Sequence, residues 1–360
     1  MEHFSCETKL ICGAGAAEAL ASFGAKRLLL VTDPYFTRSG MAAKVAAAAK
    51  AERTQIFDRV EPDPTVELAA EGTAVLREFG PDLVVALGGG SAMDCAKAMV
   101  YFAKTDARLV AIPTTSGSGS EVTDFAILTH NRVKHPLVDG RLKPHAAILD
   151  SDLLTELPKP LIADGGFDVL AHALEACAAT NAGSMTDLLA REAFSLAYAY
   201  LPASYNGCRD VRLQVHRAAS LAGLAFTQAG LGLCHAMSHA LGGIFHIPHG
   251  RINAILLPSV IACNAHIAGR KYAELARAAG ISGSADSVAV RNLRNGLIRL
   301  RKELNLPETL AQAGVPPREV WSQTGEIVSA VLADPCCRTN PTAVEDFLVR
   351  RILEEVTGRA

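Results

Sequence analysis

The chain has 360 residues, of which 49% are hydrophobic and 20% charged, and its formal net charge is −2. The length predicts two domains of an ordinary globular protein, and the near-neutral charge argues against nucleic acid or an anionic membrane as a partner. The first ten residues carry no basic segment followed by an apolar run, and no uninterrupted apolar stretch is long enough to cross a bilayer. We therefore expect a cytoplasmic protein. The nine cysteines show no CxxC spacing, which indicates reduced thiols without an assigned role.

Residues 1–157 alternate short β-type runs with helical stretches. Two segments with helical periodicity, 37–51 and 65–79, lie between the runs. Strands rich in Val, Ile and Leu that are buried on both faces are typical of a parallel sheet covered by helices, so we predict an α/β domain. The expected strands are Arg27–Thr32, Thr54–Asp58, Leu83–Leu87, Leu109–Ile112, Phe125–Thr129 and Ala146–Leu149.

Two loops of this domain are suited to a nucleotide. Residues 83–97, LVVALGGGSAMDCAK, lead from a buried strand through three glycines into a helix, whose free N–H groups and dipole favour an anion. The loop lacks the GxGxxG and Walker A patterns, and tight packing alone also explains such glycines. Residues 113–123, PTTSGSGSEVT, offer six hydroxyl side chains that can hydrogen-bond ribose, phosphate or a carboxamide, unless the segment is only a polar flexible loop.

Asp33 ends the first expected strand. An acidic residue at this place in a dinucleotide-binding domain accepts hydrogen bonds from the adenosine ribose and repels a 2′-phosphate. Taken alone, an aspartate before Pro34 is more simply explained as a turn former. The two loops strengthen the interpretation as a ribose-binding residue.

Beyond Leu157, residues 158–360 lose the strand pattern. Ala- and Leu-rich periodic segments punctuated by Gly and Pro predict an all-helical domain. Asp168 and His172 lie four residues apart in one such segment, as do His235 and His239 in another, so each pair projects from one face of its helix. We expect residues 242 and 243, both glycine, to break the second helix, and a turn at Pro248 to bring residue 249 back toward the first pair.

These side chains form a candidate metal site. A single histidine on an apolar face is usually a hydrogen-bonded core residue, but two pairs of ligand-type residues are hard to explain by packing. One carboxylate oxygen and three imidazole nitrogens suit a divalent transition metal such as iron or zinc. The four proposed ligands are Asp168, His172, His235 and His249. Because a catalytic metal keeps one position open, we expect His239 beside the metal as a catalytic proton carrier, with helix packing as the alternative.

Four motifs resemble, in order and spacing, those of the iron-dependent (group III) alcohol dehydrogenases. They are GGGSAMDCAK at 88–97, PTTSGSGSEVT at 113–123, FDVLAHALEA at 167–176 and CHAMSHALGGIFHIPHG at 234–250. Within that family, FHIPHGRINAILLP and the DPCCRTNP segment at 334–341 look most like the propanol dehydrogenases of propanediol-utilisation microcompartments.

The resemblance implies a Rossmann-like N-terminal domain, an all-helical C-terminal domain and an active site in the cleft between them. It also implies interconversion of a short-chain primary alcohol and its aldehyde, such as 1-propanol and propanal, with NAD(H) and Fe²⁺, or Zn²⁺ in its place. By motif, it assigns the metal to the four ligands named above. A homodimer or higher homo-oligomer and enzymes of a bacterial microcompartment are the implied partners.

The resemblance also implies a set of cofactor-binding positions. The sequence departs from the family pattern at three positions. Ser118 stands where threonine is commoner, which is a conservative change. Cys177 stands where an aromatic is usual and His135 where tyrosine often follows the lysine, and these two bear on the pocket, the cofactor cleft and substrate preference. The implied cofactor-binding residues are Asp33, Gly89, Gly90, Ser91, Asp94, Thr114, Thr115, Ser118, Lys134 and Leu153.

Two other functions remain open at this stage. A glycerol-dehydrogenase-like or dehydroquinate-synthase-like enzyme would share the nucleotide loops and the metal, but its substrate would call for a basic cluster that the HIPHG segment lacks. A microcompartment cargo protein with mainly an interaction role, or a filament subunit, would be expected to carry an appended amphipathic helix. The N-terminal sequence shows no obvious helix of that kind.

Overall fold

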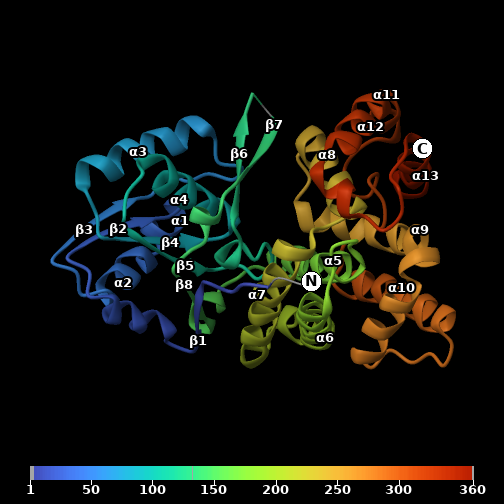
Figure 1. Cartoon of the computed structure of the whole chain (residues 1–360), viewed down its shortest axis with the longest axis horizontal. Coiled ribbons are helices and arrows are strands. Elements are labelled where there is room, and N and C mark those ends of the chain that lie inside the picture. Colours follow the sequence, from blue (N-terminus) through green and yellow to red (C-terminus); the bar gives the residue numbers. More distant parts are fainter. Residues whose placement is uncertain (1–3, 132, 359–360) are drawn as a thin grey trace. The chain divides into compact units, whose positions relative to one another are not determined.

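The computed structural model in Figure 1 describes residues 4–131 and 133–358. The chain divides into two compact units, one comprising Ser5–Leu157 and the other beginning at Pro158. The division falls where the strand pattern of the sequence ends.

The first unit is built on a six-stranded parallel sheet with strand order β1-β8-β5-β4-β2-β3. Every residue of the two strands β4 and β8 is buried, which agrees with the continuous apolar runs seen in the sequence. The strands are β1 (Lys9–Gly13), β2 (Arg27–Val31), β3 (Arg53–Phe57), β4 (Leu83–Gly88), β5 (Arg108–Pro113) and β8 (Ala146–Asp150).

Helices cover both faces of this sheet. Successive side chains of a strand point to opposite faces, so Leu29 and Val31 enter one core while Leu28 and Leu30 enter another. The first core includes residues of α3 (Val66–Phe79) and α4 (Gly90–Ala103), and the second includes residues of α2 (Met41–Ala48) and the 3₁₀ helix η1 (Ala16–Phe23). The short helix α1 (Pro34–Arg38) follows β2. The predicted α/β architecture is therefore correct.

Two strand predictions differ from the structure. The run at 125–129 does not join the parallel sheet: β6 (Phe125–His130) pairs antiparallel with β7 (Val133–Val138) in a separate two-stranded sheet. The burial of β6 alternates along the strand, as expected for a ribbon packed on one face only. Strand β1 was missed: it lies at the sheet edge, none of its residues is buried, and its apolar run is short, Leu10–Cys12.

Within its described part, residues 158–358, the second unit contains helices and no strand, as predicted. Helix α5 is its central element: residues 166–178 are all buried, and α6, α7 and α9 pack against it. Figure 1 shows α5 among the green and yellow helices that surround it. The long helices are α5 (Lys159–Ala178), α6 (Ser184–Tyr205), α7 (Arg212–Ala229), α8 (Leu233–Phe245), α9 (His249–Ala278) and α10 (Asp286–Glu303), followed by α11 (Pro317–Ser322), α12 (Thr324–Ala333) and α13 (Asp346–Thr357).

The prediction that Gly242 and Gly243 break a helix is wrong. Helix α8 continues through both glycines and ends at Phe245, and its C-cap, His246, adopts the left-handed conformation with φ 56°. A glycine inside a helix costs about 1 kcal/mol relative to alanine, which the packing of α8 against α9 and α12 outweighs. Pro248 then caps α9, and His249 is the first residue of that helix.

Helix α9 is long and apolar enough to cross a membrane by length and composition. However, 72% of its most apolar window is buried inside the fold. A helix buried to this extent is a core element of the unit. Its first residue and its first turn contribute to the site described next.

Candidate functional site

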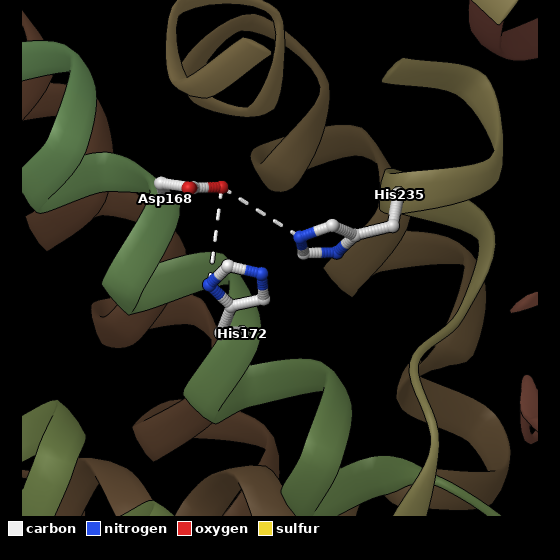
Figure 2. A group of neighbouring side chains, drawn as sticks. All are labelled: Asp168, His172 and His235. Carbon is white, nitrogen blue, oxygen red and sulfur yellow. Dashed lines mark ion pairs between the residues drawn. The ribbon is translucent and has the colours of Figure 1, made fainter. Parts of the chain in front are cut away.

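Three imidazoles from three helices surround one carboxylate oxygen of Asp168 in the helical unit. The Oδ1 atom of Asp168 on α5 lies 3.9 Å from Nδ1 of His172, 3.7 Å from Nε2 of His235 on α8, and 3.5 Å from Nε2 of His249 on α9. Figure 2 shows the carboxylate of Asp168 directed at the rings of His172 and His235. Ligand atoms bound about 2.1 Å from a tetrahedral ion lie roughly 3.4 Å apart, so these distances to Oδ1 suit a shared cation. The ligand atoms of Asp168, His172 and His235 all lie within 4.8 Å of one another, and His249 falls outside this tighter group.

The electrostatics of Asp168 and His249 favour the protonation states that bind a metal. Burial opposes a charge on Asp168, but the imidazoles of His172, His249 and His235 hold the pKa of this carboxyl well below its usual range. Burial also holds the pKa of His249 well below its usual value, despite the attraction of Asp168. An ionised carboxylate and a neutral imidazole are the forms that coordinate a cation.

Glu175, which the sequence did not single out, orients His235. Its Oε2 accepts a hydrogen bond from Nδ1 of His235 at 2.7 Å, and its two oxygens also accept from the backbone N–H groups of Gly232 and Cys234 at 2.9 and 2.6 Å. A carboxylate only accepts, so the ring carries a proton on Nδ1 and turns Nε2 toward Asp168. The signal in the sequence was a lone glutamate in the apolar stretch three residues after His172.

The Nε2 atom of His235 provides a test of whether a metal fits here. It is buried and has no hydrogen-bond partner within the described part of the chain. Burial disfavours a positive ring, yet Asp168 and Glu175 raise the pKa of His235 to about 9. A buried imidazole held by a carboxylate on one nitrogen and facing ligand atoms with the other is typical of a metal-binding histidine. The donor set and this atom both fit a divalent cation.

Asn253 and Ser238 hold the carboxylate of Asp168 in place. The Nδ2 group of Asn253 on α9 donates to Oδ1 of Asp168 at 2.8 Å, and the hydroxyl of Ser238 on α8 donates to Oδ1 of Asn253. Both side chains are completely buried. Polar partners behind a ligand fix its orientation, and neither residue was named from the sequence.

His239 lies beside this group and outside the atoms that converge on Asp168. Its Nδ1 donates to Oδ2 of Asp334 at 2.8 Å, and its ring stacks on His249 with centroids 5.2 Å apart and an interplanar angle of 17°. The side chain is 33% exposed, whereas that of His235 is 1% exposed. This placement agrees with a residue next to a metal and reachable by water. Its catalytic role remains a prediction.

In the α/β unit, the two predicted nucleotide loops lie against one another. The backbone N–H of Thr114 donates to the carbonyl of Gly88 at 2.9 Å. A Cβ atom on Gly89 would lie 3.3 Å from the hydroxyl of Thr115, and one on Gly90 would lie 3.1 Å from that of Ser118. The glycines thus allow the close approach of the second loop.

Helix α4 begins inside the first of these loops. Gly89 is its N-cap and provides no side-chain cap, and Gly90 and Ser91 form the start of the helix. The N-terminus of a helix without a side-chain cap has backbone N–H groups available to an anion. The arrangement suits the pyrophosphate of a dinucleotide, as the sequence predicted.

Asp33 has a structural function next to the same loop. It caps α1 by accepting a hydrogen bond from the N–H of Tyr35 at 2.8 Å through Oδ1. Its Oδ2 lies 3.9 Å from the position that a Cβ atom on Gly88 would occupy. The turn-forming role is therefore observed, and the other carboxylate oxygen lies at the glycine loop.

Three further cofactor candidates make contacts within the protein. Asp94 accepts a hydrogen bond from the hydroxyl of Ser120 at 2.6 Å, and burial raises its pKa. Lys134 pairs with Asp63 at 2.6 Å. Leu153 is partly buried against the sheet core. These contacts give each residue a structural function, and their role toward a cofactor remains a prediction.

Comparisons with known proteins agree with this architecture. Residues 7–151 match a family model described as iron-containing alcohol dehydrogenase, and residues 162–357 match that of the C-terminal region of the Fe-containing alcohol dehydrogenase family. The 1-propanol dehydrogenase PduQ of Citrobacter freundii is 39% identical over 99% of this chain and 100% of its own length. The NADPH-dependent butanol dehydrogenase of Clostridium saccharobutylicum is 35% identical, covering 98% of this chain and 97% of its own.

A solved structure extends the likeness to three dimensions. The sulfoacetaldehyde reductase of Bifidobacterium kashiwanohense, determined in complex with NAD⁺, aligns with a TM-score of 0.91 at 25% identity over 100% of both chains. Both the α/β unit and the helical unit therefore have counterparts in proteins of known structure.

Proposed function

The chain belongs to the iron-containing alcohol dehydrogenases, and from that premise we propose that it interconverts 1-propanol and propanal with NAD(H) and iron. The observation that carries the proposal is the convergence of one carboxylate and three imidazoles beside the half-exposed His239. The 39% identity with a 1-propanol dehydrogenase supports the choice of a short primary alcohol.

The predicted ligands would hold the cation through Oδ1 of Asp168 and one nitrogen each of His172, His235 and His249. Iron follows from the family, and zinc suits the same donors and binds more tightly than ferrous iron at most such sites. When bound, the cation supplies Lewis acidity that lowers the pKa of the alcohol hydroxyl, and NAD⁺ supplies the acceptor for the hydride. Glu175 and Asn253 keep the ligand atoms of His235 and Asp168 directed inward.

His239 is the proposed proton carrier. Asp334 holds a proton on Nδ1 of this ring, which leaves Nε2 to accept the hydroxyl proton of the alcohol during oxidation or, after protonation, to donate one to the aldehyde oxygen during reduction. The partial exposure of the ring lets the proton exchange with water. Imidazole is suited to this exchange because its usual pKa lies near neutrality.

The preference for NAD(H) over NADP(H) rests on Asp33. Its carboxylate lies at the glycine loop and would repel a 2′-phosphate. A structural relative was determined with NAD⁺, whereas one curated relative is named as NADPH-dependent, so the family accepts both cofactors. Replacement of Asp33 by glycine should shift the NADP/NAD ratio of kcat/KM by about 1–3 kcal/mol. An unchanged ratio would leave Asp33 as a turn former only.

A spectrophotometric assay tests the activity itself. NADH oxidation should occur with propanal, increase on addition of Fe²⁺ and disappear on chelation. A kcat/KM for glycerol and NAD⁺ that exceeds the value for 1-propanol and NAD⁺ would favour the glycerol-dehydrogenase-like alternative. The absence of turnover in every iron-loaded preparation would favour a role in interaction alone.

The setting of the enzyme is also a proposal. The resemblance to propanol dehydrogenases of microcompartments supports a cytoplasmic homodimer or higher homo-oligomer that works with other enzymes of such a compartment. Sedimentation of the purified protein tests its self-association. Co-purification with intact compartments tests its encapsulation.

A further inference from the structure

A second group of ligand-type atoms lies beside the candidate metal site. An imidazole nitrogen of His239, a carboxylate oxygen of Asp334 and the thiol sulfur of Cys336 all lie within 4.8 Å of one another. His239 belongs to α8, Asp334 is the N-cap of the 3₁₀ helix η6 (Pro335–Thr339), and Cys336 lies within η6. The proposed reaction uses the histidine and leaves the thiol without a function.

Asp334 holds this group together through both of its oxygens. Oδ2 accepts from Nδ1 of His239 at 2.8 Å, and Oδ1 accepts from the backbone N–H of Cys336 at 2.8 Å. All three residues are partly exposed. A cation from solvent can therefore reach atoms that are already in place.

The metal-ligand atoms of this group differ from those of the site at Asp168. Nitrogen, oxygen and sulfur together are a set that zinc and cobalt accept, and a water molecule can complete the coordination. The four predicted ligands of the first site provide no sulfur. Burial raises the pKa of Cys336 well above its usual value, so the thiol keeps its proton until a cation replaces it.

We propose that His239, Asp334 and Cys336 form a second, inhibitory site for zinc or a similar thiophilic divalent cation. On binding, the thiol of Cys336 loses its proton to solvent and its sulfur bonds to the cation. The proton on Nδ1 of His239 moves to Nε2, and Nδ1 bonds to the cation. Nε2 then carries a proton and cannot accept another. Binding of the cation does not depend on the proposed function, whereas the inhibition rests on the proposed role of His239.

Cobalt provides a readout of binding that does not depend on activity. Iron-loaded protein titrated with Co²⁺ should develop a thiolate-to-cobalt charge-transfer band, because the first group of ligands has only oxygen and nitrogen. Cys336→Ser should abolish the band. Cys337→Ser is the matched control and should keep it, since the thiol of Cys337 donates to the carbonyl of Val331. Absence of the band in the parent protein, or its persistence in Cys336→Ser, would overturn the site.

Zinc inhibition tests the consequence. Zn²⁺ added to the iron-loaded enzyme should inhibit propanal reduction while the iron content stays constant. Cys336→Ser should require at least roughly 10-fold more zinc, the lower end of the loss in metal affinity when a supporting group is removed, and Cys337→Ser should behave as the parent. Inhibition that accompanies iron loss equally in all three proteins would contradict the proposal. A cobalt band in a protein without dehydrogenase activity would uphold the site and refute the proposed function.

Discussion

His235 and His239 lie one helical turn apart on α8 and make the same kind of hydrogen bond in two environments. Each ring donates from Nδ1 to a carboxylate, Glu175 for His235 at 2.7 Å and Asp334 for His239 at 2.8 Å. The side chain of His235 is 1% exposed and turns Nε2 toward Asp168, whereas that of His239 is 33% exposed. The comparison teaches that burial, more than the hydrogen-bond partner, separates a predicted ligand from a predicted proton carrier.

Removal of the buried ring should have the largest effect. His235→Ala should lose most of its bound metal, with a fall in metal affinity greater than the roughly 100-fold that follows loss of an outer partner, because an atom of the predicted inner shell is removed. Metal analysis after purification measures this. His266→Ala on α9 is a matched control, since Nδ1 of that ring hydrogen-bonds the carbonyl of Cys263. Full metal retention by His235→Ala would contradict the proposed site.

Removal of the exposed ring should affect turnover rather than metal content. His239→Ala should keep its metal and fold while kcat falls by about 10²-fold or more, the scale of a general acid–base contribution. Steady-state kinetics and metal analysis of the same sample measure both quantities. Loss of metal in proportion to activity would make His239 a ligand, and an unchanged kcat would make it structural.

The carboxylate of the buried pair should act on metal affinity. In Glu175→Gln the side chain keeps its size but can present its NH₂ group to Nδ1 of His235, so the ring is no longer held with Nε2 free for a cation. Affinity for Fe²⁺ should fall about 10- to 100-fold. Competition with a chelator gives the value. Equal affinity in the parent and the variant would show that Glu175 serves only the backbone of residues 232–234.

The carboxylate of the exposed pair should give the smallest effect, and on kcat alone. Asp334→Asn should lower kcat about tenfold, the size of one hydrogen bond to a charged group, because the amide no longer holds His239 in one tautomer. KM for propanal and metal content should remain those of the parent. A loss of metal as large as that of Glu175→Gln would contradict the view that the His239–Asp334 pair serves turnover and the His235–Glu175 pair serves metal binding.

Much of the α/β unit and the shared helix face of Asp168 and His172 could be predicted from the sequence, because their signals are local. A strand buried on both faces has a continuous apolar run, as in β4, and a pair at i and i+4 shares one face of any helix. The brief strand β1 has only a short apolar run and no buried residue, because it lies at the sheet edge. The burial of strand β6 alternates because it belongs to a two-stranded antiparallel ribbon, and the sequence prediction assigned it to the wrong sheet.

The sequence by itself determined which residue types were available for a metal, and the tertiary structure decided which atoms meet. Glu175 lies 60 residues from His235, Asn253 lies 85 residues from Asp168, and Asp334 lies 95 residues from His239. No local pattern connects partners so far apart. Helix α8 likewise continues through two glycines because its contacts with α9 and α12 outweigh the local preference. Burial and hydrogen bonding between distant segments depend on the packed helices, and they determine the different environments of His235 and His239.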